Sequence, residues 1–221
     1  MKRFALLLLL VVAFIGFSLP PYLTLDPARS RIAPPPDLPA YYPLLVAHVL
    51  FASVAMLTAC LQVWTRLREH RPRLHRRLGR VYVFAGVVPA GLAGLAIGAV
   101  SPFGPTLRAS NVLLALLWLG CTLEGFRMGR RGRSAAHRRW MIRSFALTLS
   151  VITNRFWGAV LFLVLSPQLE TTFGGNEALM VQAIAGLSGW LGWVLPLLAA
   201  EWWLVEVAPR EAVGVSAPHP S

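Results

Sequence analysis

The chain has 221 residues, of which 56% are apolar and 14% are charged, and its mean hydropathy is +0.61. Soluble domains of this length contain fewer apolar and more charged residues, so the composition excludes an ordinary water-soluble fold. The formal net charge of +12 suggests a nucleic-acid partner only until the positions of the basic residues are considered.

Six apolar stretches are long enough to cross a bilayer as helices, given a rise of about 1.5 Å per residue. None of them alternates with the period of two that a barrel strand requires. We therefore predict an all-α, polytopic integral membrane protein with six transmembrane helices. The predicted spans are residues 4–20, 43–65, 81–100, 109–127, 144–166 and 180–204.

These spans divide the chain into five segments. Residues 1–20 have a basic start and no clear small-x-small cleavage site, which favours a signal-anchor helix over a cleaved signal peptide. Residues 21–42 are a proline-rich outer loop, and 43–166 are a central four-helix bundle made of two hairpins. Residues 167–207 contain an outer loop and the sixth span, and 208–221 are predicted to be a disordered cytoplasmic tail.

Most of the 21 basic residues lie before the first span and in two arginine-rich turns, 66–80 and 127–143. Six crossings would place these segments on one side of the membrane. This is the positive-inside pattern, and it predicts that both termini are cytoplasmic. Topology and attraction to anionic lipid head groups account for the basicity, so no nucleic-acid partner is expected.

A short basic element occurs twice, as LHRRLGR over 74–80 and as AHRRWMIR over 136–143. Each copy places a histidine, His75 or His137, at the mouth of a membrane-length segment. The two side chains either hold one cofactor between them or serve as interfacial anchors. In the first case the following arginines, including Arg76 and Arg138, would bind carboxylates of the cofactor or an anionic electron donor.

Helical residues 18 apart share a face, so His137 and Arg155 belong to one polar stripe, together with Ser144 and Thr148. Charges within a span usually face the protein interior. We therefore expect Arg155 to point inward, near the midplane, toward a small anionic ligand, a cofactor carboxylate or a water-filled cavity. His48 heads a face of small residues on the outer side. Such faces suit either close helix packing or a flat ligand.

Neutral histidine is a common axial ligand of haem iron, and a bundle with one histidine on each of two helices can hold it. The chain contains no C-x-x-C-H motif, so a haem would be b-type rather than covalently attached. Clustered zinc ligands, an acid placed to orient a catalytic histidine, and a P-loop are not found. The sequence leaves open whether the protein is an enzyme.

The strings HRRLGRVY (75–82) and HRRWMIRS (137–144) resemble a family of bacterial membrane proteins called domain of unknown function 2306 (DUF2306). The resemblance covers about 43–166 and implies a multi-pass protein of the bacterial cytoplasmic (inner) membrane. A weaker similarity is to the 561-type transmembrane cytochromes b, which carry two haems. There His48, His75 and His137 would match the first, second and fourth ligand positions, but residues 109–127 contain no histidine.

Three functions remain open from the sequence. The first is electron transfer by one b-type haem held by His75 and His137 near the cytoplasmic face, with a redox partner. The second is a haem-free transporter or small-molecule-binding protein in which Arg155 and His48 line the site. The third is a structural or assembly protein whose arginines bind lipid phosphates.

Overall fold

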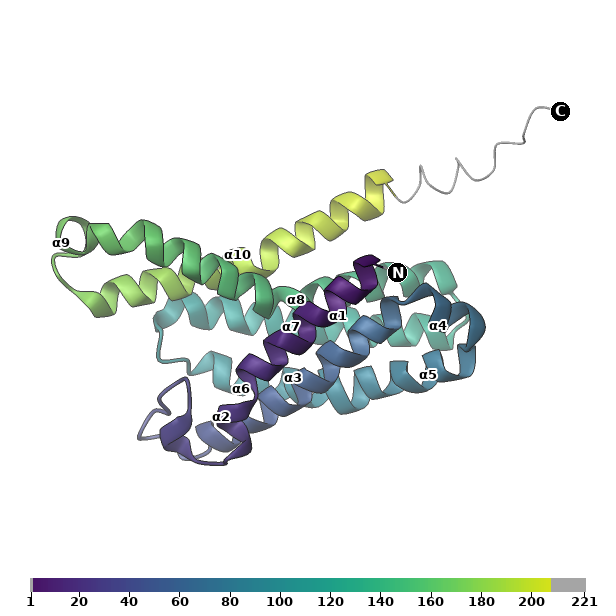
Figure 1. The fold of residues 1–221 in the computed structure, drawn as a ribbon, viewed down its shortest axis with the longest axis horizontal. Helices are drawn as coiled ribbons and strands as arrows, with labels where there is room; N and C mark the ends of the chain where they lie inside the picture. Colours follow the sequence, from purple (N-terminus) through teal and green to yellow (C-terminus); the bar gives the residue numbers. More distant parts are fainter. Residues whose placement is uncertain (1, 208–221) are drawn as a thin grey trace.

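The structure, a computed structural model, describes residues 2–207, and every regular element in that part of the chain is helical. The predicted tail, 208–221, lies outside the described residues. Figure 1 shows the arrangement. The long helices are α1 (Lys2–Ser18), α3 (Tyr41–Val63), α5 (Pro72–Arg80), α6 (Val88–Ala99), α7 (Gly104–Arg130), α8 (Ser134–Leu165) and α10 (Glu177–Trp202). The short ones are α2 (Pro20–Leu23), α4 (Thr65–His70) and α9 (Leu169–Thr172), and π-helical segments occupy Val81–Val87 and Trp203–Val207.

Five helical segments are long and apolar enough to cross a membrane: Tyr41–Val63, Pro72–Ala99, Gly104–Arg130, Ser134–Thr172 and Glu177–Glu206. They include the last five predicted spans. The first predicted span is an apolar helix of only 17 residues, α1, because the chain bends at Leu19 before Pro20 and Pro21. Six crossings therefore stay a prediction.

Neighbouring spans in the sequence pack side by side. The helix formed by α5, Val81–Val87 and α6 contacts α3 on one side and α7 on the other, and α7 continues to α8. Helix α10 packs along α8 and also contacts α7. All five spans contribute to one buried cluster, which contains Ala55, Tyr82, Trp118, Leu147 and Trp193. The predicted core of residues 43–166 is therefore too small, since α10 belongs to it.

Helix α1 lies along the line where α3 meets α8. Val11 of α1 is fully buried against Met56 and Cys60 of α3, and Leu149 and Ile152 of α8 pack on the same cluster. The direct contact between α3 and α8 is slight compared with that between other neighbours. Helix α1 thus covers a weakly closed edge of the bundle.

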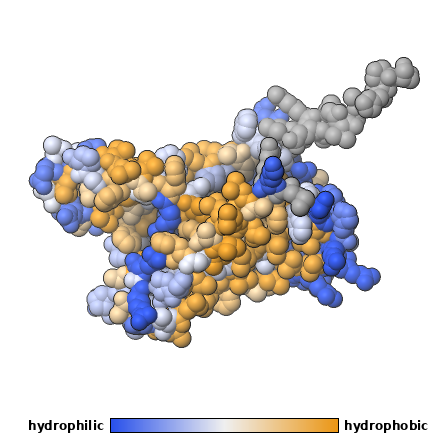
Figure 2. Space-filling model, in the orientation of Figure 1, coloured by the Kyte–Doolittle hydropathy of each residue, from blue (hydrophilic) through white to orange (hydrophobic). Residues whose placement is uncertain are grey.

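Two ends of the molecule can be defined by composition. The arginine-rich end contains α4, α5 and the start of α8, and the proline-rich end contains the loop of residues 20–43. Figure 1 places the start of α1 and the last turns of α10 toward the arginine-rich end. Figure 2 shows a broad apolar surface between hydrophilic ends, as a membrane protein requires,. The side of the membrane that each end faces stays a prediction.

Close helix contacts explain the small-residue faces. A Cβ on Gly86 would lie 2.9 Å from the Cα of Ala55, and one on Gly91 would lie 2.7 Å from a methyl carbon of Leu119. These glycines serve helix packing, as in other membrane bundles. Between these two glycines, Pro89 cannot donate to the carbonyl four residues earlier, and the helix widens there into the π-helical segment that carries Tyr82,.

Candidate functional site

His75 and His137 both lie at the arginine-rich end, and their pairing stays a prediction. His75 lies on α5 and His137 in the first turn of α8. Arg68, on α4, and Arg76, on α5, belong to the same end. Two helices that are far apart in the sequence thus each place an imidazole at the arginine-rich end of the bundle.

The ring of His137 is held by the neighbouring helix. Its Nδ1 lies 2.7 Å from the carbonyl oxygen of Gly125 and can donate to it. A Cβ on Gly129 would lie 2.9 Å from the same nitrogen, so only glycine leaves room for the ring. Donation from Nδ1 leaves the lone pair on Nε2, which is the arrangement found in histidines that bind metals.

His75 has the opposite property. Its Nδ1 is buried and has no hydrogen-bond partner among the described residues. Only its backbone is held, since Gln62 Nε2 donates to the His75 carbonyl oxygen at 2.9 Å. A buried polar nitrogen without a partner is uncommon and calls for a missing ligand or water. The hydroxyl of Tyr42, at the proline-rich end, is the other such atom in residues 2–207.

His48 does not join this pair. It lies toward the proline-rich end, where its Nδ1 is 2.8 Å from the carbonyl oxygen of Ala90. A Cβ on Gly94 would lie 2.9 Å from the ring, so α6 packs directly against the imidazole. His48 is therefore a packing residue that links α3 to α6.

The arginines named from the sequence are exposed. Arg76 follows His75 on the surface of α5, and Arg138 lies over the ring of Trp203 at 5.4 Å from its centroid. Arg143 donates through two nitrogens to the carboxylate of Glu201, and this ion pair joins α8 to α10. The sequence did not predict it. An acid on the last span at the arginine-rich end was the available signal.

Arg155 is exposed, so the expectation that it points into the bundle is wrong. Helices α8 and α10 run away from the other helices toward the α9 turn, which opens this face of α8 (Figure 1). Its depth in a membrane stays a prediction. The preceding residue, Asn154, packs against Gly192, and the next residue of α10, Trp193, donates to Ser110 in the second turn of α7. Arg155 lies 21 residues after Ser134 and 17 residues before Thr172, the two ends of its span.

A buried cluster of hydroxyl groups lies between the two ends. The Tyr82 hydroxyl is 2.5 Å from Ser144 Oγ and 2.7 Å from Thr148 Oγ1. Trp118 Nε1 donates to Thr148 Oγ1 at 2.9 Å. Thr122 Oγ1 lies 2.6 Å from Ser144 Oγ. Every member is buried. The sequence places Ser144 and Thr148 on the same helical stripe as His137. In the structure, both side chains contact the Tyr82 hydroxyl. Tyr82 and Ser144 each follow their histidine by seven residues, so their contact closes the bundle two turns inside the His75–His137 pair.

Two imidazoles from different helices lie at the arginine-rich end, one oriented by a backbone carbonyl and one with a buried nitrogen that has no partner among the described residues. Among residues 2–207, no group of three or more His, Cys, Asp or Glu side chains is placed to hold a metal ion. A histidine pair with a macrocycle needs no third protein ligand.

Comparison with known proteins gives one match. The sequence profile of the DUF2306 family, described as a predicted membrane protein, matches residues 45–204. No curated protein and no solved structure matches the chain. The family match includes α10, in agreement with the place of that helix in the core.

Proposed function

The chain belongs to the DUF2306 family of predicted membrane proteins, and we propose that it is a redox protein that holds one b-type haem between His75 and His137. The observation that carries this proposal is the state of the two imidazoles. One is oriented by a backbone carbonyl with its second nitrogen free, and the other has a buried nitrogen without a partner among the described residues. Both lie at the arginine-rich end of the spans.

The haem would supply one-electron chemistry, and the protein would supply its position and its surroundings. His137 is oriented by Gly125, and the Gln62 side chain fixes the backbone of His75. The exposed Arg76 and Arg138 are available for the propionates or for an anionic redox partner,. We infer from the positive-inside pattern that this end faces the cytoplasm of a bacterial cell.

The chain supplies no second pair of axial histidines. Its five histidines are residues 48, 70, 75, 137 and 219, and α7 contains none. His48, the residue that a haem at the opposite end would use, is packed between α3 and α6. Electrons would therefore enter and leave at one end of the protein.

A spectrum tests the proposal. The protein is expressed with haem supplied, purified in detergent, and recorded before and after dithionite. We expect a Soret band that shifts on reduction and that is lost in both His75→Leu and His137→Leu. His48→Leu is the matched control and should retain the band. A folded, colourless wild-type protein, or a band that survives in both variants, would refute the proposal.

A further inference from the structure

A second site lies at the proline-rich end, apart from the proposed haem. Helices α1 and α8 both run from the arginine-rich end toward this end, and Phe14 and Ile15 of α1 share an apolar cluster with Ile152 of α8. One turn farther along, α1 reaches Phe17 and α8 reaches Arg155. Arg31, from the loop, lies close enough to Arg155 for the two charges to interact.

Arg31 is fixed on the end of α1 by two contacts. Its Nη2 donates to the carbonyl oxygen of Phe17 at 2.7 Å, and its Cζ lies 4.0 Å from the centroid of the Phe17 ring. These contacts leave the other donors of the guanidinium free, because a guanidinium has five N–H groups. The Arg31 guanidinium group is therefore fixed in position and keeps N–H donors that can bind a ligand.

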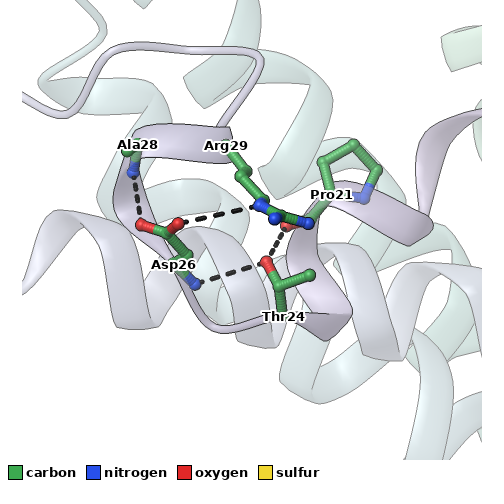
Figure 3. A network of polar contacts seen from close by, with 5 residues as sticks. All are labelled: Pro21, Thr24, Asp26, Ala28 and Arg29. Atoms are coloured by element: carbon green, nitrogen blue, oxygen red, sulfur yellow. Dashed lines mark hydrogen bonds and ion pairs between the residues drawn. The ribbon is translucent and has the colours of Figure 1, made fainter.

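The turn that precedes Arg31 is held by local hydrogen bonds, drawn in Figure 3. Thr24 Oγ1 donates to the Pro21 carbonyl oxygen at 3.0 Å, and the Asp26 carboxylate accepts from Ala28 N at 3.0 Å. The same carboxylate lies 3.7 Å from Arg29 Nε. Asp26 thus partly neutralises Arg29, and the turn fixes where the loop approaches α1.

These residues surround a shallow hollow of about 500 Å³, lined by Phe17, Pro20, Pro21, Thr24, Arg29 and Arg31. Figure 2 shows a hydrophilic band that interrupts the apolar surface at this end of the molecule. The hollow is open on one side, so a ligand can enter from water or from the adjoining lipid.

The charge of this region is not balanced by the protein. Arg31 and Arg155 have no carboxylate partner in the part of the chain that the structure describes. An arginine within a membrane span is costly unless an anion accompanies it,. Guanidinium groups bind phosphate oxygens through paired, charge-assisted hydrogen bonds.

We propose that Arg31, which lines the hollow, and Arg155, one turn beyond Ile152 on α8, bind the phosphate group of one ligand, either a lipid head group or a free phosphate. The site does not depend on the haem. Phe17 and the prolines would contact the less polar part of the ligand, and the two guanidinium groups would hold the phosphate.

The test uses the full chain and two probes: inorganic phosphate added to protein in a neutral detergent, and phosphatidylglycerol added to the same micelles. We expect at least one probe to raise the melting temperature. In Arg155→Gln and Arg31→Gln, about tenfold more of that probe should be needed, since a charge-assisted hydrogen bond contributes about 1.5–3 kcal/mol. The matched control is Arg130→Gln, which removes one exposed charge at the other end.

The two probes identify the source of the phosphate. A response to phosphatidylglycerol alone assigns a lipid head group, and a response to inorganic phosphate assigns a soluble ligand. The proposal is overturned if neither probe stabilises the wild type, or if Arg155→Gln and Arg31→Gln respond as Arg130→Gln does. Arg155→Lys should restore part of the response, because it returns the charge without the planar fork.

Discussion

The arginine-rich and proline-rich ends of this protein use histidine and arginine in opposite ways. At the arginine-rich end the arginines are numerous and mostly exposed, whereas His75 keeps a buried nitrogen without a partner among the described residues. At the proline-rich end His48 is bonded and packed, whereas Arg31 is fixed by the end of α1. The number of arginines at an end thus indicates the predicted membrane topology. The contacts of individual side chains indicate which residues are available to bind a ligand.

The largest effect should come from filling the space beside the two bonded histidines. Gly94→Ala places a methyl group 2.9 Å from the His48 ring, and Gly129→Ala does the same at His137 Nδ1. Overpacking of this kind costs about 1–3 kcal/mol. We expect both variants to unfold at lower SDS concentration, and only Gly129→Ala to lose the Soret band. Equal loss of that band in Gly94→Ala would remove the distinction between the ends.

The buried hydroxyl cluster between the ends provides the second prediction. Tyr82→Phe removes a hydroxyl that contacts both Ser144 and Thr148, and it should lower the free energy of unfolding by about 1–2 kcal/mol,. Tyr42→Phe removes a buried hydroxyl with no partner in residues 2–207, so it should be neutral or stabilising,. An SDS titration of both variants measures the difference. If Tyr82→Phe is as stable as the wild type, the cluster does not support the fold.

Replacing His48 and His75 compares a bonded imidazole with an unbonded one. In protein prepared without haem, His48→Leu should lose about 1 kcal/mol with its bond to the Ala90 carbonyl,. His75→Leu should be neutral or more stable, because it removes a buried nitrogen that lacks a partner,. Thermal unfolding of both variants measures the difference. If His75→Leu is less stable than His48→Leu, then His75 supports the fold more than His48 does, which contradicts the prediction.

The smallest effects are expected from the ion pairs. Arg143→Gln breaks a paired contact to Glu201 that joins two helices and should cost about 0.2–1 kcal/mol,. Arg29→Gln breaks an exposed 3.7 Å contact to Asp26 and should not change stability measurably,. A double-mutant cycle with Glu201→Gln separates the pair energy from other losses. A coupling energy of zero would show that Arg143 and Glu201 do not hold α8 to α10.

Hydropathy predicted the membrane spans well because it is a local property of each segment. Five spans agree with the structure, and α1 falls short because Pro20 and Pro21 end it early. Ser144 and Thr148 are buried, as the polar stripe through His137 predicted, because this part of α8 lies within the bundle. The same prediction failed for Arg155, where α8 leaves its neighbours. A helical face repeats along one element, but burial depends on what lies opposite.

The contacts between distant segments could not be read from the sequence in the same way. The bond from Arg31 to Phe17 depends on how the proline-rich loop folds back over α1. The Arg143–Glu201 pair depends on α10 lying along α8, and span order alone does not determine that neighbour. The repeated element predicted that His75 and His137 lie at the same end of the bundle, as they do, and their pairing around a cofactor stays a prediction.

The position of α1 has a consequence for biosynthesis. Val11 is buried against residues from both α3 and α8, and the α8 residues are made more than 130 positions later. A chain that enters the membrane from its N-terminus must therefore leave one side of α1 in lipid, or on a transient partner, until α8 arrives. Helix α1 is therefore made long before some of the neighbours against which it packs, and its packing is complete only after α8 has entered the membrane.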